Sequence, residues 1–283
     1  MARTVASVVL ILLTGLGMAA AQDSIDQELQ QSSDEHMREE LGVNPITTPQ
    51  IQEILKTLEV VRPIPLDVIS AANRDANFSN RLQTAMHFGS LVADGFLLAL
   101  AERPTDVQDV GRALIRQSRA LGVGDRLTKR SKSLLELSDK GDWVGMRQEL
   151  IRTQEDVEQS MLDLRDAEMA DLISFGGWLR GFQLAATSTA TDYTPAKAAL
   201  LGNFEIMEYF MERLNTLHPR LQKTEFVTTL AAHLKDINAV AIEANGVPLT
   251  REQVEKVRRL ADDAEAAAMA RVDEEGRFEK SRP

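Results

Sequence analysis

The sequence contains no cysteine, and this absence excludes several kinds of site at once. Without thiols the chain can form neither a disulfide bond nor a zinc site with thiolate ligands. It also has no cysteine that could act as a nucleophile or carry a lipid. Because no covalent cross-link is available, the stability of the fold must come from its hydrophobic core.

The sequence motifs of common enzymes and cofactor sites are absent too. The chain has no Gly-x-Ser-x-Gly nucleophile elbow, no phosphate-binding loop and no dinucleotide fingerprint. It also lacks a His-Glu-x-x-His zinc motif and the Glu-x-x-His pairs of di-metal bundles. The sequence therefore predicts no catalytic residue, no metal ligand and no cofactor. The groups considered for a metal site are Glu205, Glu208 and Glu212, which share one helical face, and the histidines His36, His87, His218 and His233.

Alternating runs of β-branched residues with hairpin punctuation are also missing, so the sequence predicts no β-strand. Aromatic residues make up only 5% of the chain and fall at spacings typical of a helical core, which does not favour base stacking. The formal net charge of −11 repels polyphosphate. Nucleic acid is therefore not expected as a partner.

The first 21 residues have the three parts of a cleavable secretory signal peptide. Arg3 supplies positive charge, Val8 to Met18 are mostly apolar, and small residues occupy positions 19–21 before Gln22. Glycine and hydroxyl residues interrupt the apolar run from Val5 to Ala21, which is shorter than the about 20 residues of a membrane-spanning helix. We expect cleavage after Ala21 and a soluble mature chain, periplasmic or secreted. An uncleaved membrane anchor is the alternative.

Residues 22–47 are expected to form an acidic, flexible leader. The stretch from Gln22 to Glu40 carries seven acidic residues and a single basic one, Arg38. It has too few apolar residues to bury a stable face. At the other end of the chain, residues 273–283 are expected to form a charged, frayed tail.

For residues 48–272 we expect an all-α fold, an irregular multi-helix bundle of about eight helices. In this part of the sequence apolar residues recur at helical spacing, and capping residues precede them. Pro104 is expected to stop one helix, and the helix from Thr194 to reach about Leu217. A division into two lobes is placed near residues 188–194. The expected starts are Thr48, Ser79 or Asn80, Thr105, Asp125, Asp142, Ala167, Thr194, the segment after Pro219, and Thr250, which forms a capping box with Gln253.

Two of these helices carry small residues at intervals of four. The helix from Ser79 to Glu102 is apolar on more than one face and should be central. Small residues four apart let two backbones approach closely, which predicts that this helix packs against the helix from Ala167 to Ala190. The small residues are Ala85, Gly89 and Ala93 in the first helix and Gly177, Gly181 and Ala185 in the second. The alternative is that Gly176 and Gly177 interrupt the second helix and expose Trp178 beside a ligand cleft.

Basic residues gather between Arg112 and Lys132, where seven bases accompany a single acid, Asp125. Such a patch favours docking to an anionic partner, either an envelope protein or an anionic membrane surface. The alternative is that these bases pair with the many carboxylates between Glu149 and Asp171. The candidate docking residues are Arg112, Arg116, Arg119, Arg126 and Arg130.

Three functions remain after these exclusions. The export signal, the helical frame, the charged patches and the missing catalytic motifs favour a periplasmic protein that acts by binding, as an accessory subunit or adaptor of an envelope assembly. The first alternative is a small-molecule carrier or sensor with an apolar pocket between the Ser79–Glu102 and Ala167–Ala190 helices. The second is a helical enzyme without a recognisable motif.

Overall fold

The computed structural model describes residues 62–69, 74–202 and 205–279. The predicted signal peptide, the acidic leader and the helix expected from Thr48 lie outside these residues and stay predictions. The described residues belong to one unit, residues 49–283, and the division expected near residues 188–194 stays a prediction.

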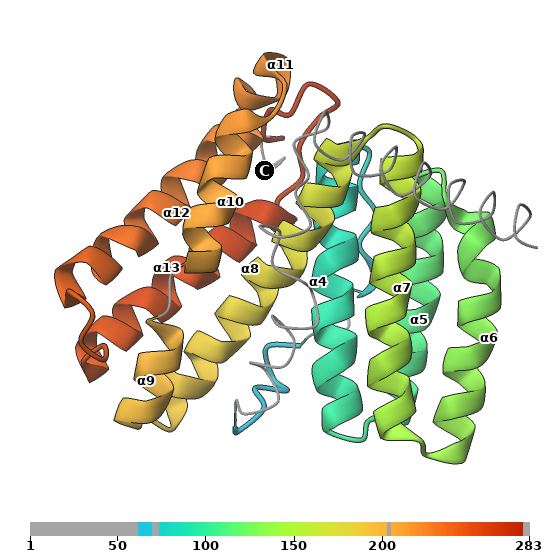
Figure 1. The fold of residues 1–283 in the computed structure, drawn as a ribbon, viewed down its shortest axis with the longest axis horizontal. Coiled ribbons are helices and arrows are strands. Elements are labelled where there is room, and N and C mark those ends of the chain that lie inside the picture. Colours follow the sequence, from blue (N-terminus) through green and yellow to red (C-terminus); the bar gives the residue numbers. More distant parts are fainter. Residues whose placement is uncertain (1–61, 70–73, 203–204, 280–283) are drawn as a thin grey trace, which may run out of the picture. The chain divides into compact units, whose positions relative to one another are not determined.

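The described part of the chain is all-α, as the sequence predicts, and contains no β-strand. Neighbouring helices are joined by short connections, and most begin at a capping side chain or a first-turn proline. In chain order the helices are α4 (Arg81–Leu100), α5 (Pro104–Ala120), α6 (Gly124–Lys140), α7 (Trp143–Asp163), α8 (Ala167–Thr191), α9 (Pro195–Leu201), α10 (Glu205–Thr216), α11 (Pro219–Gln222), α12 (Glu225–Ala244) and α13 (Arg251–Met269) (Figure 1).

Helices α4 to α7 form a four-helix bundle in which each helix contacts the next and α7 returns to α4. Helix α8 runs between this bundle and helices α9 to α13 (Figure 1). On the side away from the bundle α8 contacts α13, which packs against α12, and α12 packs against α10. The centre of the fold is thus the pair α4 and α8, which share the most extensive helix contact in the described part of the chain.

Helix α4 is enclosed by its neighbours, as its sequence predicts. Asn80 sets its start, because its side-chain oxygen accepts hydrogen bonds from the backbone N–H groups of Leu82 at 3.0 Å and Gln83 at 3.3 Å. Every residue from Leu82 to Ala99 is buried. A helix that is apolar on most faces is stable only inside the fold, where its side chains are removed from water.

Two glycines allow α4 and α8 to approach more closely than side chains would permit. A Cβ atom added to Gly89 would lie 1.9 Å from the carbonyl oxygen of Ile173 and 2.5 Å from the amide nitrogen of Gly177. A Cβ atom added to Gly176 would lie 1.9 Å from the carbonyl oxygen of Met86. Gly176 precedes the predicted stripe of α8 by one residue. The stripe residues other than Gly89 are buried at Ala85, Ala93, Gly177 and Gly181 and half-buried at Ala185.

Helix α8 continues without a break through Gly176 and Gly177, and Trp178 is only 6% exposed. The alternative of an interrupted helix with an exposed Trp178 is therefore wrong. The rings of Trp178 and Phe175 lie 5.4 and 5.3 Å from the ring of Phe210, between centroids. These contacts join α10 to α8 and bury large apolar surfaces there.

Helix boundaries differ from the sequence prediction in three places, one of which is the segment after Pro219, where the structure has two helices, α11 and α12. Helix α5 begins at Pro104 and its N-cap is Arg103, so Thr105 does not cap it. Proline suits the first helical position because the N–H that it lacks would have no partner there. Thr194 caps α9 as predicted, but α9 ends at Leu201 instead of near Leu217, and Gly202, a poor helix former, follows it.

Residues 270–279, which follow α13, are more ordered than the frayed tail that the sequence predicts, and residues 280–283 lie outside the described residues. Val272 and Phe278 form an isolated antiparallel bridge, and the N–H of Phe226 donates to the carbonyl oxygen of Gly276 at 2.9 Å. Gly276 has a φ of +76°, a conformation that glycine adopts without steric cost. Val272 is buried and Phe278 packs against the core, so apolar burial holds this turn despite its charged residues.

The glycine contacts predict how substitutions affect stability. We expect Gly176→Ala to lower the free energy of unfolding by about 2–3 kcal/mol, because its Cβ would displace the backbone of α4. The matched control is Gly111→Ala in α5, where the nearest atom would be a side-chain carbon of Leu134 at 3.8 Å. This control should gain up to about 1 kcal/mol from helix propensity. Urea unfolding measures both values, and equal stability of the two variants would contradict the close contact.

Candidate functional site

Three of the five candidate docking arginines lie in a row on the exposed face of α5. Arg112, Arg116 and Arg119 are all exposed. Arg112 forms an ion pair with Asp109 of the same helix. Arg116 donates to the carbonyl oxygen of Arg74 at 2.6 Å and lies 3.7 Å from the carboxylate of Asp75. Arg119 has no ion pair with another described residue. We call these three residues the α5 arginine row.

The other two candidate arginines, Arg126 and Arg130, are not shown to add exposed charge to this row. Arg130 in α6 is half-buried, and its guanidinium binds Asp156 at 2.8 Å and Glu149 at 3.2 Å in α7. The side chain of Arg126 lies outside the described residues. For Arg130, pairing with the carboxylates of the neighbouring helix is therefore what the structure shows.

The groups considered for a metal site do not come together among the described residues, and His36 lies outside them. Glu205, Glu208 and Glu212 are exposed on α10, and His233 lies on α12. His218 caps α11 by accepting a hydrogen bond from the N–H of Arg220. No cluster of three or more potential metal ligands occurs among the described residues.

His87 is a core residue of α4. It is only 2% exposed, and its ring meets the ring of Phe78 edge to face, with 5.1 Å between centroids. The sequence predicts this placement, because a histidine within an apolar helix usually lies at a helix contact.

A buried ion pair that the sequence analysis did not identify joins α4 to α8. Arg180 and Asp94 are 2% and 1% exposed. The guanidinium of Arg180 donates to both carboxylate oxygens of Asp94, at 2.7 and 3.3 Å, and also to the carbonyl oxygen of Val68 at 3.1 Å. Burial acts to lower the pKa of Arg180, but nearby acids, Asp94 foremost, outweigh this effect and hold the pKa above its ordinary value, so Arg180 stays charged.

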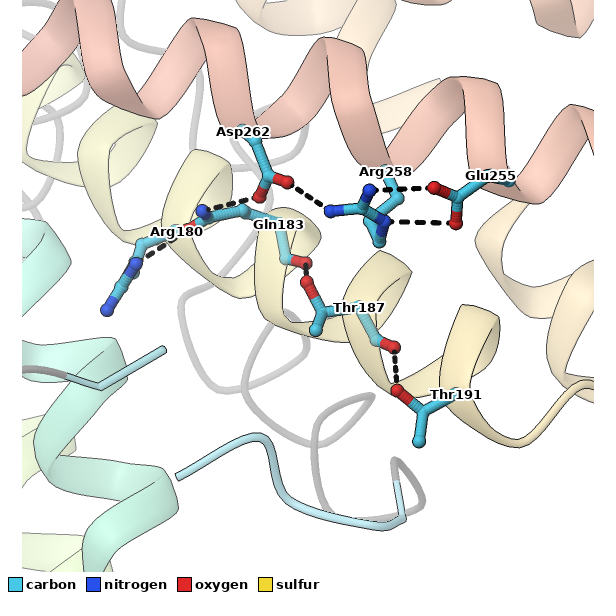
Figure 2. Close-up of polar contacts among 7 residues, drawn as sticks. All are labelled: Arg180, Gln183, Thr187, Thr191, Glu255, Arg258 and Asp262. Atoms are coloured by element: carbon cyan, nitrogen blue, oxygen red, sulfur yellow. Dashed lines mark hydrogen bonds and ion pairs between the residues drawn. The ribbon is translucent and has the colours of Figure 1, made fainter. Parts of the chain in front are cut away.

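Polar side chains continue from this ion pair to α13. Arg180 donates to the side-chain oxygen of Gln183 at 2.5 Å, and Gln183 donates to Asp262 of α13 at 2.9 Å. Asp262 in turn accepts from Arg258, which also binds Glu255 at 2.7 Å. Figure 2 shows this chain of contacts along the facing sides of α8 and α13, with the Arg180 side chain pointing away from α13.

Glu265 is a second buried acid in this region. It lies in α13 and is 4% exposed. Neither of its carboxylate oxygens has a hydrogen-bond partner that meets normal geometry among the described residues. Burial raises the pKa of Glu265 to about 7, against the opposing effect of the Arg180 charge. We call Asp94, Arg180 and Glu265 the buried charge cluster.

A second carboxyl with a raised pKa lies between α7 and α8. Glu158 accepts hydrogen bonds from the hydroxyl of Ser174 at 2.6 Å and the amide of Gln154 at 2.8 Å. Burial raises its pKa to about 7 despite these two donors. Ser174 is buried in the helix contact, so this pair holds α7 to α8 and does not present a serine nucleophile to a substrate.

No protein-family model, curated protein or solved structure shows significant similarity to the chain. The interpretation of its sites therefore depends on their own geometry. None of the described helices combines the length and the apolar character that spanning a bilayer requires.

The buried ion pair predicts a large effect of removing one partner. We expect Arg180→Met to lower the free energy of unfolding by about 3–5 kcal/mol, because Asp94 would stay buried without a partner. Adding Asp94→Leu to this variant should recover most of the loss, since no buried charge then remains unpaired.

Arg258→Met is the matched control for Arg180→Met. The ion pairs of Arg258 are partly exposed, so this change should cost about 1 kcal/mol or less. Urea unfolding followed by circular dichroism measures all variants. A loss in Arg180→Met no larger than in the control would show that the buried pair has no special role.

Proposed function

We propose that this chain is an exported, periplasmic helical protein that acts by binding, as an accessory subunit or adaptor of a cell-envelope assembly. The observation that carries this proposal is the α5 arginine row, a line of exposed positive charge on a chain whose formal net charge is −11. Removing the predicted signal peptide with Arg3 would make the chain one unit more negative. A local basic surface on an acidic protein steers an anionic partner toward one orientation.

The contacts of the α5 arginine row leave it able to exchange partners. Arg112 pairs with Asp109 on the protein surface, and Asp75, beside Arg116, is 87% exposed at its side chain. Exposed pairs of this kind contribute only about 0–1 kcal/mol each. Carboxylates of a partner could therefore replace them at little cost, whereas the half-buried pairs of Arg130 are less accessible.

The packing of the helices favours surface binding over the alternative of a carrier. At Gly89 and Gly176 the backbones of α4 and α8 meet, which leaves no room there for an apolar ligand. A cavity of about 130 Å³ lies near the start of α4, but its lining is mainly polar and includes Gln83, Arg271 and Glu279. Pockets for drug-sized ligands usually measure roughly 300–1,000 Å³ and are mostly apolar.

Charge reversal tests the binding role. The tagged full-length protein is made with three substitutions combined, Arg112→Glu, Arg116→Glu and Arg119→Glu. It is then purified from cross-linked envelope extracts. We expect a partner that co-purifies with the unmodified protein to be lost at least tenfold, and its recovery to fall as salt is raised.

The matched control combines Arg220→Glu, Lys235→Glu and Arg259→Glu, which are exposed bases on α11, α12 and α13. It changes the net charge by the same amount and should retain the partner. Equal loss in both variants would argue against a role for the α5 arginine row. An unmodified protein that purifies alone and monomeric would argue against the binding function itself.

Export has its own test. We expect the mature protein to be recovered from the periplasm or the medium with Gln22 as its first residue, because signal peptidase cleaves after small residues. Replacing Ala19 and Ala21 by glutamine should leave the precursor intact. Mass spectrometry of the intact chain distinguishes the two forms, and a wild-type protein that retains residues 1–21 would overturn cleavage after Ala21.

A further inference from the structure

The buried charge cluster contains two acids and one base. Asp94 comes from α4, Arg180 from α8 and Glu265 from α13, and each is less than 5% exposed. Three helices that are far apart in the sequence therefore meet at three ionisable side chains. If both acids were ionised, the cluster would carry a net negative charge away from water, which is strongly unfavourable.

The hydrogen bonds of Arg180 decide which acid is its partner. Its guanidinium donates twice to Asp94, once to the carbonyl oxygen of Val68 and once to Gln183. Four of its five N–H groups are thereby used, and none of these bonds reaches Glu265. Asp94 is therefore the ionised partner of Arg180, and Glu265 is the surplus acid.

We propose that Glu265 carries a proton when α13 is packed against α4 and α8, and that loss of this proton loosens α13 from both helices. A protonated carboxyl is neutral and can remain in the helix contact without a paired charge. An ionised Glu265 without a hydrogen-bond partner has to regain water, and α13 can provide this only by moving away from α4 and α8. The packing of this helix then depends on the pH of the compartment that holds the protein.

The groups that surround Glu265 favour the protonated form on balance. From α4, Asp94 acts against ionisation and the hydroxyl of Ser90 favours it. From α8, Arg180 favours ionisation, but its charge is already shared with Asp94. On α13 itself, Asp262 is bound by Gln183 and Arg258.

The remaining neighbours add no further charge that faces Glu265. Helix α12, which also packs against α13, buries only apolar residues. His87 of α4 is in contact with Phe78. Burial is therefore the main influence on Glu265, and it raises the pKa to about 7 from an ordinary value of 4.5.

The sign of the pH effect follows from these two values. Between pH 4.5 and pH 7 the packed state binds a proton that the loosened state has released, so raising the pH favours loosening. The equilibrium constant for loosening of α13 should rise up to about tenfold per pH unit in this range and level off above it. From pH 5 to pH 8 the expected increase is on the order of 50-fold.

Hydrogen exchange of the full-length protein, read by mass spectrometry on α13 peptides, measures this equilibrium. Exchange rates at pH 5 to 8 are corrected for the intrinsic pH dependence of amide exchange. In the wild-type protein, the corrected exchange rates of the α13 peptides should increase on the order of 50-fold from pH 5 to pH 8. Glu265→Gln keeps the size of the side chain but cannot ionise, so its α13 peptides should show less than about a threefold change.

The matched control is Glu158→Gln, which removes the other carboxyl whose pKa is about 7. Because Glu158 lies between α7 and α8, this variant should keep the wild-type pH dependence in α13. Equal pH dependence of α13 in the wild-type protein and Glu265→Gln would overturn the proposal.

A second measurement does not depend on the variants folding. The carboxyl carbon resonance of Glu265 in the uniformly carbon-13-labelled wild-type protein, assigned by through-bond correlation to its backbone, reports its titration directly. A midpoint between pH 6 and pH 8 is expected, and a midpoint near the ordinary value of 4.5 would overturn the proposal.

Discussion

The close contact between α4 and α8 is the constraint on which the rest of the structure depends. Gly89 and Gly176 let the two backbones meet, and the hydroxyl of Ser90 donates to the carbonyl oxygen of Gly176 across the contact at 3.3 Å. Asp94 and Arg180 follow these glycines at distances of about one turn along each helix, so the same contact brings their side chains together. Packing geometry and ion pairing are therefore two consequences of one helix arrangement.

Because Arg180 is buried and bound to Asp94, few hydrogen-bond donors remain for an acid that α13 brings to the same place. A buried guanidinium needs nearly all its N–H groups bound, and Asp94, Gln183 and Val68 supply the acceptors. Glu265 then enters the same region, where a nearby donor, the hydroxyl of Ser90, already donates to the carbonyl oxygen of Gly176. Other attachments of α13 are its apolar contacts and the bond from Gln83 to the carbonyl oxygen of Ala268 at 2.8 Å. The contact between α13 and its neighbours is thus firm at its apolar residues and sensitive to protonation at Glu265.

Local features of the chain and the packing of α4 against α8 were predictable from the sequence, whereas the side-chain contacts between distant residues were not. The caps at Asn80, Asp142 and Thr250 depend on residues within four positions, which is why sequence spacing identified them. Arg180 and Asp94 are 86 residues apart, and nothing local shows that they pair. A signal was nevertheless present, because each is a charged residue within an otherwise apolar helical stretch, and such a residue is stable there only with a buried partner.

The basic residues of α5 and α6 also show that a sequence pattern does not reveal contacts between distant residues. Helical spacing correctly placed Arg112, Arg116 and Arg119 on one exposed face of α5. Arg130 belongs to the same basic stretch of sequence, yet it turns toward Glu149 and Asp156 of α7, because α6 and α7 pack side by side. A run of like charges in a sequence therefore overstates the surface available to a partner. The arginines that keep loose, solvated pairs are the ones through which an anionic partner could bind, and here these lie on α5.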